Sequence, residues 1–284
     1  MARPLPPPDD RSSTKRAVLA VRAGTAVRRP DRLAGEEPMA IRVAGPGQAP
    51  VDVAVTMRTP GHDAELAIGF LLSEGLLAGP DLVGLTVEVG DPADVATPEN
   101  ELVVRIRRAL DPATVPVRAF VASASCGICG RASLDDVAIR CAPLRPGPRV
   151  DAAVIAALPD RLRTGQSVFE QTGGLHASGL FDPVGRLLAA REDVGRHNAL
   201  DKLIGAAALA GELPLHDRVL AVSGRVSFEI VQKAAMAGIS VVAAVSAPTD
   251  LAVEAAARVG MTLVGFVRGG GFNVYAGEER IVLA

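Results

Sequence analysis

The chain has very few aromatic side chains: they make up 3% of its residues, with one tyrosine and no tryptophan. Its core must therefore be built from alanine, valine, leucine and isoleucine. With 49% hydrophobic and 22% charged residues, the composition is still that of an ordinary globular protein. A chain of 284 residues can bury a large core, in one large domain or in two smaller ones.

Cysteines and long apolar runs are scarce too. Three cysteines, an odd number, argue against a disulfide framework and fit a reducing compartment. The proline-rich start, MARPLPPPDDRSSTKR, lacks the apolar stretch of a signal peptide. The best candidate for a membrane span, ISVVAAVSAPTDLAV, is interrupted by Pro248 and Asp250. We therefore expect a cytoplasmic protein that makes no use of a membrane.

Neither sign of charge predominates. The formal net charge is −2 at pH 7, which gives no electrostatic reason to expect binding to nucleic acid or to an anionic membrane. The composition therefore points to neither of them as a partner.

Four stretches of the chain differ in pattern. Prolines and charges leave residues 1–15 nothing to bury, so this tail is expected to be disordered. Residues 16–120 contain short strand-like runs and one helical segment, which His62 helps to start and Asp63 can cap. They predict a small α+β domain. Residues 121–149 are expected to form a mobile loop and linker, and residues 150–284 have the regular pattern of an α/β domain.

Strands and helices alternate in the last of these stretches. Residues 175–193 predict a hairpin that turns at 182–185, and a helix with one buried face follows over 200–208. Three valine-rich runs, RVLAVSG, ISVVAAVSA and MTLVGFVRG, are then separated by helical patterns that end at Gly238 and Gly260. This order predicts a βαβαβ unit with a mostly parallel sheet. Ligands bind at the carboxyl ends of such strands, where the loops 223–225, 246–250 and 268–271 are expected.

Two of the three cysteines, Cys126 and Cys129, stand three apart in ASASCGICGRAS, a segment of small residues that could hardly pack a core. A structural zinc site needs four ligands, and although Cys141 could be a third, no second CxxC or HxxxH completes the set. A zinc deaminase would need an HxE and a PCxxC, which are absent. A redox-active dithiol and two incidental small hydrophobes stay open, although flanking glycines make a poor helix start.

A further interpretation of the same segment is a loop that carries a nucleophilic thiolate. Backbone amides freed by the glycines, together with Arg131, would favour the thiolate over the thiol. Glycine mobility would let the sulfur reach two different partners in turn. A sulfur carrier needs both properties.

Several polar residues near predicted helix starts have a structural and a functional interpretation. His197 could contact a ligand or brace its own helix. The adjacent acids at 192–193 are better explained as charges at a helix N-terminus than as an acid–base pair. Arg225 and Glu229, with Lys233 one turn further on, could form a solvated i,i+4 pair. Of these three residues, Arg225 lies in a strand-end loop and is the best placed for a phosphate.

Four motifs, in this order, resemble one known family. SCGICG at 125–130, REDVGRHNALDK at 191–202, SGRVSFEIVQKAA at 223–235 and GFVRGGGFNVY at 265–275 are similar to the FdhD/NarQ family of accessory sulfurtransferases for formate dehydrogenase. The resemblance extends over nearly all of the chain after the N-terminal tail, apart from residues 80–100.

The resemblance implies both a fold and a reaction. The fold is α/β, with a cytidine-deaminase-like three-layer α/β/α C-terminal domain that lacks the deaminase zinc site, and a smaller N-terminal α+β domain. The reaction is a sulfur transfer: Cys126 takes sulfur from a cysteine desulfurase as a persulfide, with Cys129 as an assisting thiol. The sulfur then passes to molybdenum in bis(molybdopterin guanine dinucleotide), before this cofactor enters formate dehydrogenase. The family implies no metal held by the protein's own side chains.

The family's cofactor-binding stretch maps onto Phe266, Val267, Arg268, Gly269, Gly270 and Gly271. Consecutive glycines allow close backbone approach, their amides can form an anion-binding nest, and Arg268 can bind phosphate. A hairpin turn with a solvated arginine is the structural alternative. Because the cofactor carries two guanine nucleotides, a homodimer with twin sites is expected. A thiol–disulfide oxidoreductase, and a chaperone that holds the cofactor without transferring sulfur, are the rival functions.

Overall fold

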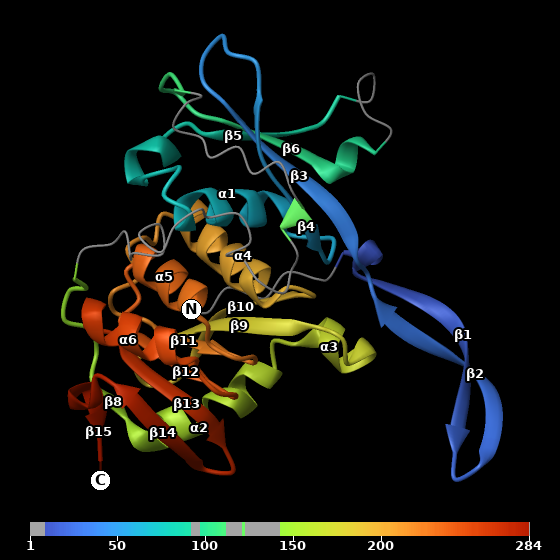
Figure 1. Ribbon diagram of the computed structural model, residues 1–284, viewed down its shortest axis with the longest axis vertical. Helices are drawn as coiled ribbons and strands as arrows, with labels where there is room; N and C mark the ends of the chain where they lie inside the picture. The colour runs from blue at the N-terminus through green and yellow to red at the C-terminus, as the bar shows by residue number, and fades with distance from the viewer. Residues whose placement is uncertain (1–8, 92–96, 112–120, 123–142, 284) are drawn as a thin grey trace.

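The computed structural model describes residues 9–91, 97–111, 121–122 and 143–283, the pair 121–122 by its backbone only. Two sheets, of six and five strands, form the body of the protein, with helices on and between them (Figure 1). A two-stranded ribbon extends from this body. None of the described helices is both long and apolar enough to cross a membrane.

The larger sheet consists of β9 (His176–Phe181), β10 (Leu187–Asp193), β11 (Val219–Val222), β12 (Val241–Ala244), β13 (Thr262–Arg268) and β14 (Gly271–Ala276). Its order is β10-β9-β11-β12-β13-β14. The three central strands run parallel, which confirms the predicted βαβαβ unit, and antiparallel strands flank them. The predicted hairpin is β9–β10, and it turns where expected, since the N–H of Gly185 donates to the carbonyl of Asp182 at 2.9 Å.

Helices cover both faces of this sheet: α2 (Ala152–Arg163), α4 (Arg196–Leu209), α5 (Phe228–Met236) and α6 (Asp250–Val259). Side chains alternate along β11, so Val219 and Ala221 pack in the cluster that contains α2, whereas Leu220 and Val222 pack with α4, α5 and α6. The expected three-layer α/β/α arrangement is therefore confirmed. A short strand pair, β8 (Val150–Asp151) and β15 (Ile281–Val282), lies beside α2.

The smaller sheet consists of β3 (Glu37–Ala44), β4 (Val51–Arg58), β5 (Thr86–Val89), β6 (Glu101–Arg105) and β7 (Val121–Ala122), in the order β5-β6-β3-β4-β7. Two turns of 3-10 helix, Gly79–Leu82 and Pro98–Asn100, lie in its connections. One long helix, α1 (Asp63–Ser73), packs between this sheet and the helices of the larger one. One continuous apolar cluster therefore joins the two sheets.

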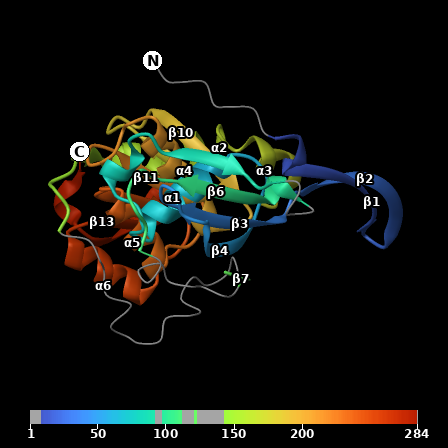
Figure 2. The ribbon, with the colours of Figure 1, turned by 90° about the horizontal axis from the view of Figure 1, so that it is seen from above.

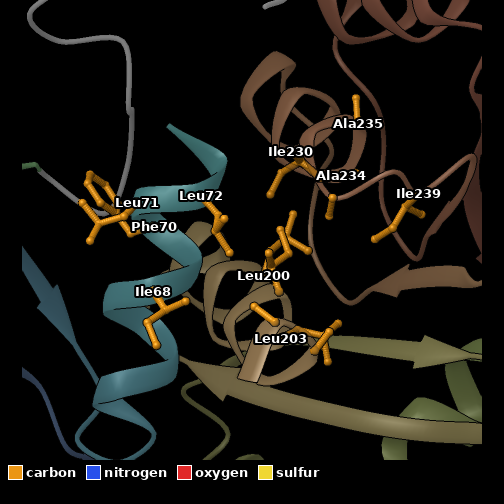
Figure 3. Close-up of a cluster of buried hydrophobic side chains, with 14 of the residues drawn as sticks. Ile68, Phe70, Leu71, Leu72, Leu200, Leu203, Ile230, Ala234, Ala235 and Ile239 are labelled. Atoms are coloured by element: carbon orange, nitrogen blue, oxygen red, sulfur yellow. The ribbon is translucent and has the colours of Figure 1, made fainter. Parts of the chain in front are cut away.

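The contact of α1 with α4 is close because glycines lie at the crossing. A Cβ on Gly69 would come within 1.8 Å of the carbonyl oxygen of Asp201, and one on Gly205 within 1.8 Å of the carbonyl oxygen of Glu65. Around this crossing, side chains such as Leu200 of α4 fill the space between α1 and α5 (Figure 3). Backbone contact of this kind is possible only without a side chain at these positions.

The start of α1 differs from the prediction. Asp63 is the first helical residue, while His62 takes the N-cap position with a left-handed backbone at φ 60° and no side-chain cap bond. The carboxylate of Asp63 is committed elsewhere: it accepts two hydrogen bonds from the guanidinium of Arg58, at 3.1 and 2.9 Å. Arg58 is fully buried and also reaches Glu37 at 3.2 Å. The sequence predicted that Asp63 would cap α1, but its carboxylate instead pairs with the buried guanidinium of Arg58.

The ribbon, which we call the arm, consists of β1 (Ser13–Arg22) and β2 (Thr25–Ala34), paired antiparallel along their whole length. A turn of 3-10 helix, Asp10–Ser12, precedes it, so regular structure begins before the expected end of the tail at residue 15. The arm projects from the body in both views (Figures 1 and 2) and touches it at α3 (Ser167–Thr172). A strand-like run at 15–22 in the sequence predicts β1, whereas no such run marks β2.

Candidate functional site

The loops that were expected to face a ligand lie together at one edge of the larger sheet. The strands β11, β12 and β13 end there, and β9 begins there because it runs antiparallel to β11, with Ser178 opposite Val222. The helices α4, α5 and α6 all start at the same edge. We call it the carboxyl edge and define it by His176 and the segments 193–197, 223–229, 246–250 and 266–271. Such an edge is the usual ligand site of open α/β sheets.

The predicted cofactor stretch forms a tight hairpin at this edge. Gly269 and Gly270 are the two turn residues between β13 and β14, at φ 59° and φ 78°, so both have the left-handed backbone that favours glycine. No heavy atom lies within 4 Å of a Cβ built on either of them or on Gly271. The backbone of this turn is therefore accessible. The side chain of Val267, in contrast, is buried in the cluster with α2, which leaves only its backbone for contact.

Backbone strain marks the end of β13. Phe266 has φ 53°, a left-handed value that a bulky residue rarely adopts, at a point where the register of β13 and β14 shifts. Its N–H donates to the carbonyl of Ser246 at 3.1 Å, and the guanidinium of Arg268 lies 5.2 Å from its ring centroid. Strained residues of this kind cluster at functional sites, where the surrounding structure holds them.

The neighbouring loops are tied to each other. Val226 and Pro248 form an isolated bridge, the N–H of Val226 donates to Ala247 at 3.1 Å, and the N–H of Thr249 donates back to Val226 at 2.9 Å. Thr249 also caps α6, because its hydroxyl accepts a hydrogen bond from the N–H of Ala252 at 3.4 Å. The starts of α5 and α6 are thereby held together.

His197 braces two helices. Its Nε2 lies 2.9 Å from a carboxylate oxygen of Glu229 and 3.2 Å from the hydroxyl of Ser227, both at the start of α5. Burial alone would raise the pKa of Glu229, but the hydrogen bond from His197 and the nearby charges, those of Lys233 and Arg196 among them, together outweigh it and lower that pKa. The other oxygen of Glu229 is buried and has no hydrogen-bond partner among the described residues. The structure therefore supports the bracing role for His197.

His176, which the sequence did not single out, lies at the start of β9 close to these groups. Burial lowers its pKa, and electrostatic interactions with the nearby Arg196 and His197 lower it further. A Cβ on Gly224 would come within 3.2 Å of its Nδ1, so the ring lies against the backbone of a predicted ligand loop. A neutral imidazole at this edge can accept or donate a hydrogen bond.

The adjacent acids at 192–193 support helix starts, as expected. Asp193 is completely buried; it accepts hydrogen bonds from the N–H groups of Thr59 at 3.1 Å and Gly195 at 2.8 Å, and it pairs with Lys202 at 2.7 Å. Glu192 accepts from two N–H groups in the first turn of α3, at 2.9 and 2.7 Å. Both carboxylates are therefore structural.

The prediction of a solvated i,i+4 pair among Arg225, Glu229 and Lys233 is wrong for Lys233, which is buried. Lys233 is 5% exposed, and its Nζ lies 2.9 Å from both carboxylate oxygens of Asp201 and 2.8 Å from the hydroxyl of Ser73. Its partners come from α4 and α1, which local spacing along α5 could not reveal. Arg225 is exposed at the carboxyl edge, as its loop position predicted.

Cys126, Cys129 and Arg131 lie outside the described residues. The last described residue before them is Ala122 in β7, which pairs with Thr56 of β4. The hydroxyl of Thr56 lies 3.4 Å from the side-chain oxygen of Asn198 in the first turn of α4. The described chain therefore leaves the smaller sheet beside a helix that starts at the carboxyl edge. In the same described ranges, no three His, Cys, Asp or Glu side chains gather as a metal site would require.

These features define an α/β protein with a polar, glycine-bearing edge suited to an anionic ligand. The family model that matches the chain is that of the FdhD/NarQ family, over residues 34–282. The chain is 49% identical, over 278 residues, to the sulfur carrier protein FdhD of Streptomyces avermitilis, covering 96% of this chain and 97% of that one. It is 48% identical to the sulfur carrier protein FdhD of Mycobacterium tuberculosis, covering 95% and 99%. The chain belongs to the FdhD/NarQ family.

A solved structure shares the fold. The crystal structure of a protein assigned as a formate dehydrogenase accessory protein, from Desulfotalea psychrophila, superposes with a TM-score of 0.71. The match covers 95% of this chain and 99% of the chain in that structure, at 24% identity. At this identity the likeness supports the fold alone.

Proposed function

We propose that this chain is a cytoplasmic sulfur carrier, a sulfurtransferase that serves formate dehydrogenase. In this proposal Cys126 takes sulfur from a cysteine desulfurase as a persulfide. It then passes the sulfur to the molybdenum of bis(molybdopterin guanine dinucleotide). This cofactor is the substrate of the transfer and is afterwards inserted into formate dehydrogenase. Membership of the family supports the proposal, as do the relatives that are named sulfur carriers at 47–49% identity.

The observation that carries the proposal is the position of Ala122. Cys126 follows Ala122 four positions later in the sequence. The described chain before Cys126 thus ends beside the start of α4, at the carboxyl edge, and this position supports the proposal.

The first sulfur transfer is an exchange of one S–S bond for another. The thiolate of Cys126 attacks the outer sulfur of the donor persulfide, the donor's S–S bond breaks, and the donor cysteine leaves as a thiolate. No oxidant or reductant enters, because the number of S–S bonds stays the same. In the second transfer the S–S bond of the persulfide breaks and the thiolate of Cys126 is the leaving group. The outer sulfur takes two electrons from a reduced molybdenum(IV) centre of the substrate as it becomes the metal's sulfido ligand. Cys129 assists by attacking the sulfur of Cys126 in a stalled persulfide, which forms a disulfide and releases hydrosulfide.

The carboxyl edge supplies what the cofactor's phosphates and guanines need. Open amides at Gly269 and Gly270, the guanidinium of Arg268 and the starts of three helices offer donors and positive potential to pyrophosphate. The partly exposed imidazole of His176 is a polar group that can hydrogen-bond to a guanine. The described residues of the carboxyl edge thus offer donors and positive charge of the kind that a nucleotide-bearing substrate needs.

The proposal is tested by incubating the protein with a cysteine desulfurase and cysteine, then measuring its intact mass. We expect a gain of one sulfur, about 32 Da, that cyanide reverses. The gain should be absent in Cys126→Ala and should persist in Cys129→Ala, the matched control. A gain that needs both cysteines equally would favour a dithiol oxidoreductase, and an active dehydrogenase produced by the double variant would favour a simple cofactor chaperone.

A further inference from the structure

His176 differs from the other histidines in having no protein partner for its ring. The chain has four histidines, and the structure describes all of them. His62 and His197 each pair with a glutamate, at 3.3 and 2.9 Å, and the Nδ1 of His216 lies 3.3 Å from a backbone carbonyl oxygen. The ring of His176 forms no hydrogen bond with any described residue. Polar atoms that are withdrawn from water normally have a partner, so this ring is a candidate contact for a ligand.

The ring lies between the loop 223–225 and the start of α4. A Cβ built on Gly224 would lie 3.2 Å from its Nδ1, 3.5 Å from its Cε1 and 3.8 Å from the Cδ of Arg196. Nε2 is not among these nearest atoms, so it is the ring nitrogen further from the loop backbone. Because the side chain of His176 is partly exposed, Nε2 is the atom that we assign to ligand contact.

The side chains around this ring disfavour a positive charge on it. Arg196 and His197 lie in the first turn of α4, which contains no acidic residue. Burial lowers the pKa of His176, and interactions with these two residues lower it further, whereas Asp193, opposite it on β10, has the reverse effect. An anion bound beside the ring would offset these effects and favour the charged form.

The carboxylates of this region are committed to other side chains. Asp193 pairs with Lys202 at 2.7 Å, and a carboxylate oxygen of Glu229 lies 2.9 Å from the Nε2 of His197. The negative charge that would complement the ring must therefore come from a ligand. The substrate of the proposed function carries such charge on its pyrophosphates.

We propose that His176 binds a phosphate group of this substrate and takes up a proton as it does so. The inference rests on the proposed function, which supplies the pyrophosphate. The imidazolium donates a charge-assisted hydrogen bond from Nε2 to a phosphate oxygen. The proton comes from solvent, and no bond of the substrate breaks. His176 and the glycine hairpin of β13 and β14 lie at the same edge, three strand spacings or about 14 Å apart, so an extended nucleotide can reach both.

The proton makes binding depend on pH. Because the bound anion raises the pKa of His176, the affinity should rise as the pH falls through the interval between the lowered value of the free protein and the higher value of the complex. One proton changes the affinity by at most about tenfold for each pH unit. Below this interval the ring is charged before the ligand binds, and the dependence ends.

The test uses GDP-mannose and the full-length protein. The pyrophosphate of this probe is a diester, as it is in the substrate, so the probe itself does not titrate near neutral pH. Calorimetry at about pH 6, 7 and 8, in buffers of different ionisation enthalpy, measures the affinity and counts the protons taken up. We expect proton uptake, and an affinity that is about threefold or more higher at the lowest of these pH values than one unit above it. Guanosine, which has no phosphate, should bind without proton uptake.

Two variants of His176 separate its charge from its structural role. His176→Gln should bind the probe about tenfold more weakly at the lowest pH and lose most of the proton uptake. His176→Arg stays positively charged at every pH tested and should bind the probe with little pH dependence. His216→Gln is the matched control, because His216 is exposed and precedes β11 at the opposite end of the strands; it should behave as the wild type does.

A second measurement needs no variant protein in the complex. NMR titration of the imidazole protons of the wild type should show that the probe raises the pKa of His176. The resonances of His176 are identified by their loss in His176→Gln. This measurement tests the contact even where a substitution disturbs the fold.

Three results would overturn the inference. They are a wild type that does not bind the probe or binds it without proton uptake, a His176→Gln variant that keeps the pH dependence, and guanosine that raises the pKa of His176 as much as the probe does. The last result would assign the contact to the base. Persulfide formation is a separate readout: its absence in the wild type would refute the sulfur carrier, whether or not the probe binds with a proton.

Discussion

The motif RHNALDK at 196–202 enters two different environments along α4. At its start, His197 is 12% exposed by side chain and bonds to Glu229 at the carboxyl edge. Within the next turn and a half, Asp201 and Lys202 are each 1% exposed and ion-paired with Lys233 and Asp193. His197, Asp201 and Lys202 are all titratable residues, but they differ in how deeply they are buried and in their partners. The start of the motif therefore lies at the carboxyl edge, whereas its end holds the helices together in the core.

The largest effect is expected at the buried end. In Lys233→Met the carboxylate of Asp201 would stay buried without its cation, and breaking such a pair costs about 3–5 kcal/mol. Burial already raises the pKa of Asp201, so the variant should also take up a proton there. Urea unfolding checks the loss of stability. Arg225→Met, at the exposed edge, is the control and should change stability by less than about 0.5 kcal/mol; equal losses in the two variants would remove the distinction.

A smaller effect is expected where α1 meets β10. Burial would raise the pKa of Glu65, but hydrogen bonds from Arg191 and His62 outweigh it and lower the pKa from 4.5 to about 2. Because the folded-state value is the lower one, Glu65 stabilises the fold above pH 4.5 and loses this effect as the pH falls to about 2. The contribution is about 3 kcal/mol.

Denaturant unfolding across this pH range tests the ion pair. Glu65→Gln should be less stable than the wild type near neutral pH, and its stability should fall less steeply between pH 4.5 and about 2. Glu170→Gln, at an exposed position of α3, is the matched control and should follow the wild type. A slope that Glu65→Gln leaves unchanged would show that other carboxylates cause the acid sensitivity.

The crossing of α1 and α4 should respond to a single methyl group. In Gly205→Ala the new Cβ would meet the carbonyl oxygen of Glu65, so the helices must separate at a cost of about 1–3 kcal/mol. Thermal unfolding measures the loss. Gly79→Ala, which has no heavy atom within 4 Å of the added Cβ, is the control. An equally stable Gly205→Ala would show that the crossing tolerates a side chain.

The sequence predicted what depends on local pattern. The alternation of valine-rich runs and helices gave the parallel strands β11, β12 and β13, and the glycines at 269–271 gave the hairpin turn. It could not predict contacts between distant segments. Asp63 binds the buried Arg58 instead of capping α1, and Lys233 of α5 pairs with Asp201 of α4. His176 was missed because only the antiparallel pairing of β9 with β11 brings it to the carboxyl edge. The roles of Cys126 and Cys129 stay predictions.

The smallest effect is expected at the carboxyl edge, beside the start of α4. Burial is the first cause of the lowered pKa of His176, and the cation of Arg196 is the second. Arg196→Gln should therefore raise this pKa part of the way toward its ordinary value of 6.5, because the burial remains. NMR titration of the imidazole protons would follow it. Arg225→Gln, another cation of the same edge, is the control and should leave the titration of His176 unchanged, since Arg225 is not among the charges that shift it. A titration that neither variant moves would mean that burial alone keeps His176 neutral, and the carboxyl edge would then present an uncharged imidazole whatever anion it binds.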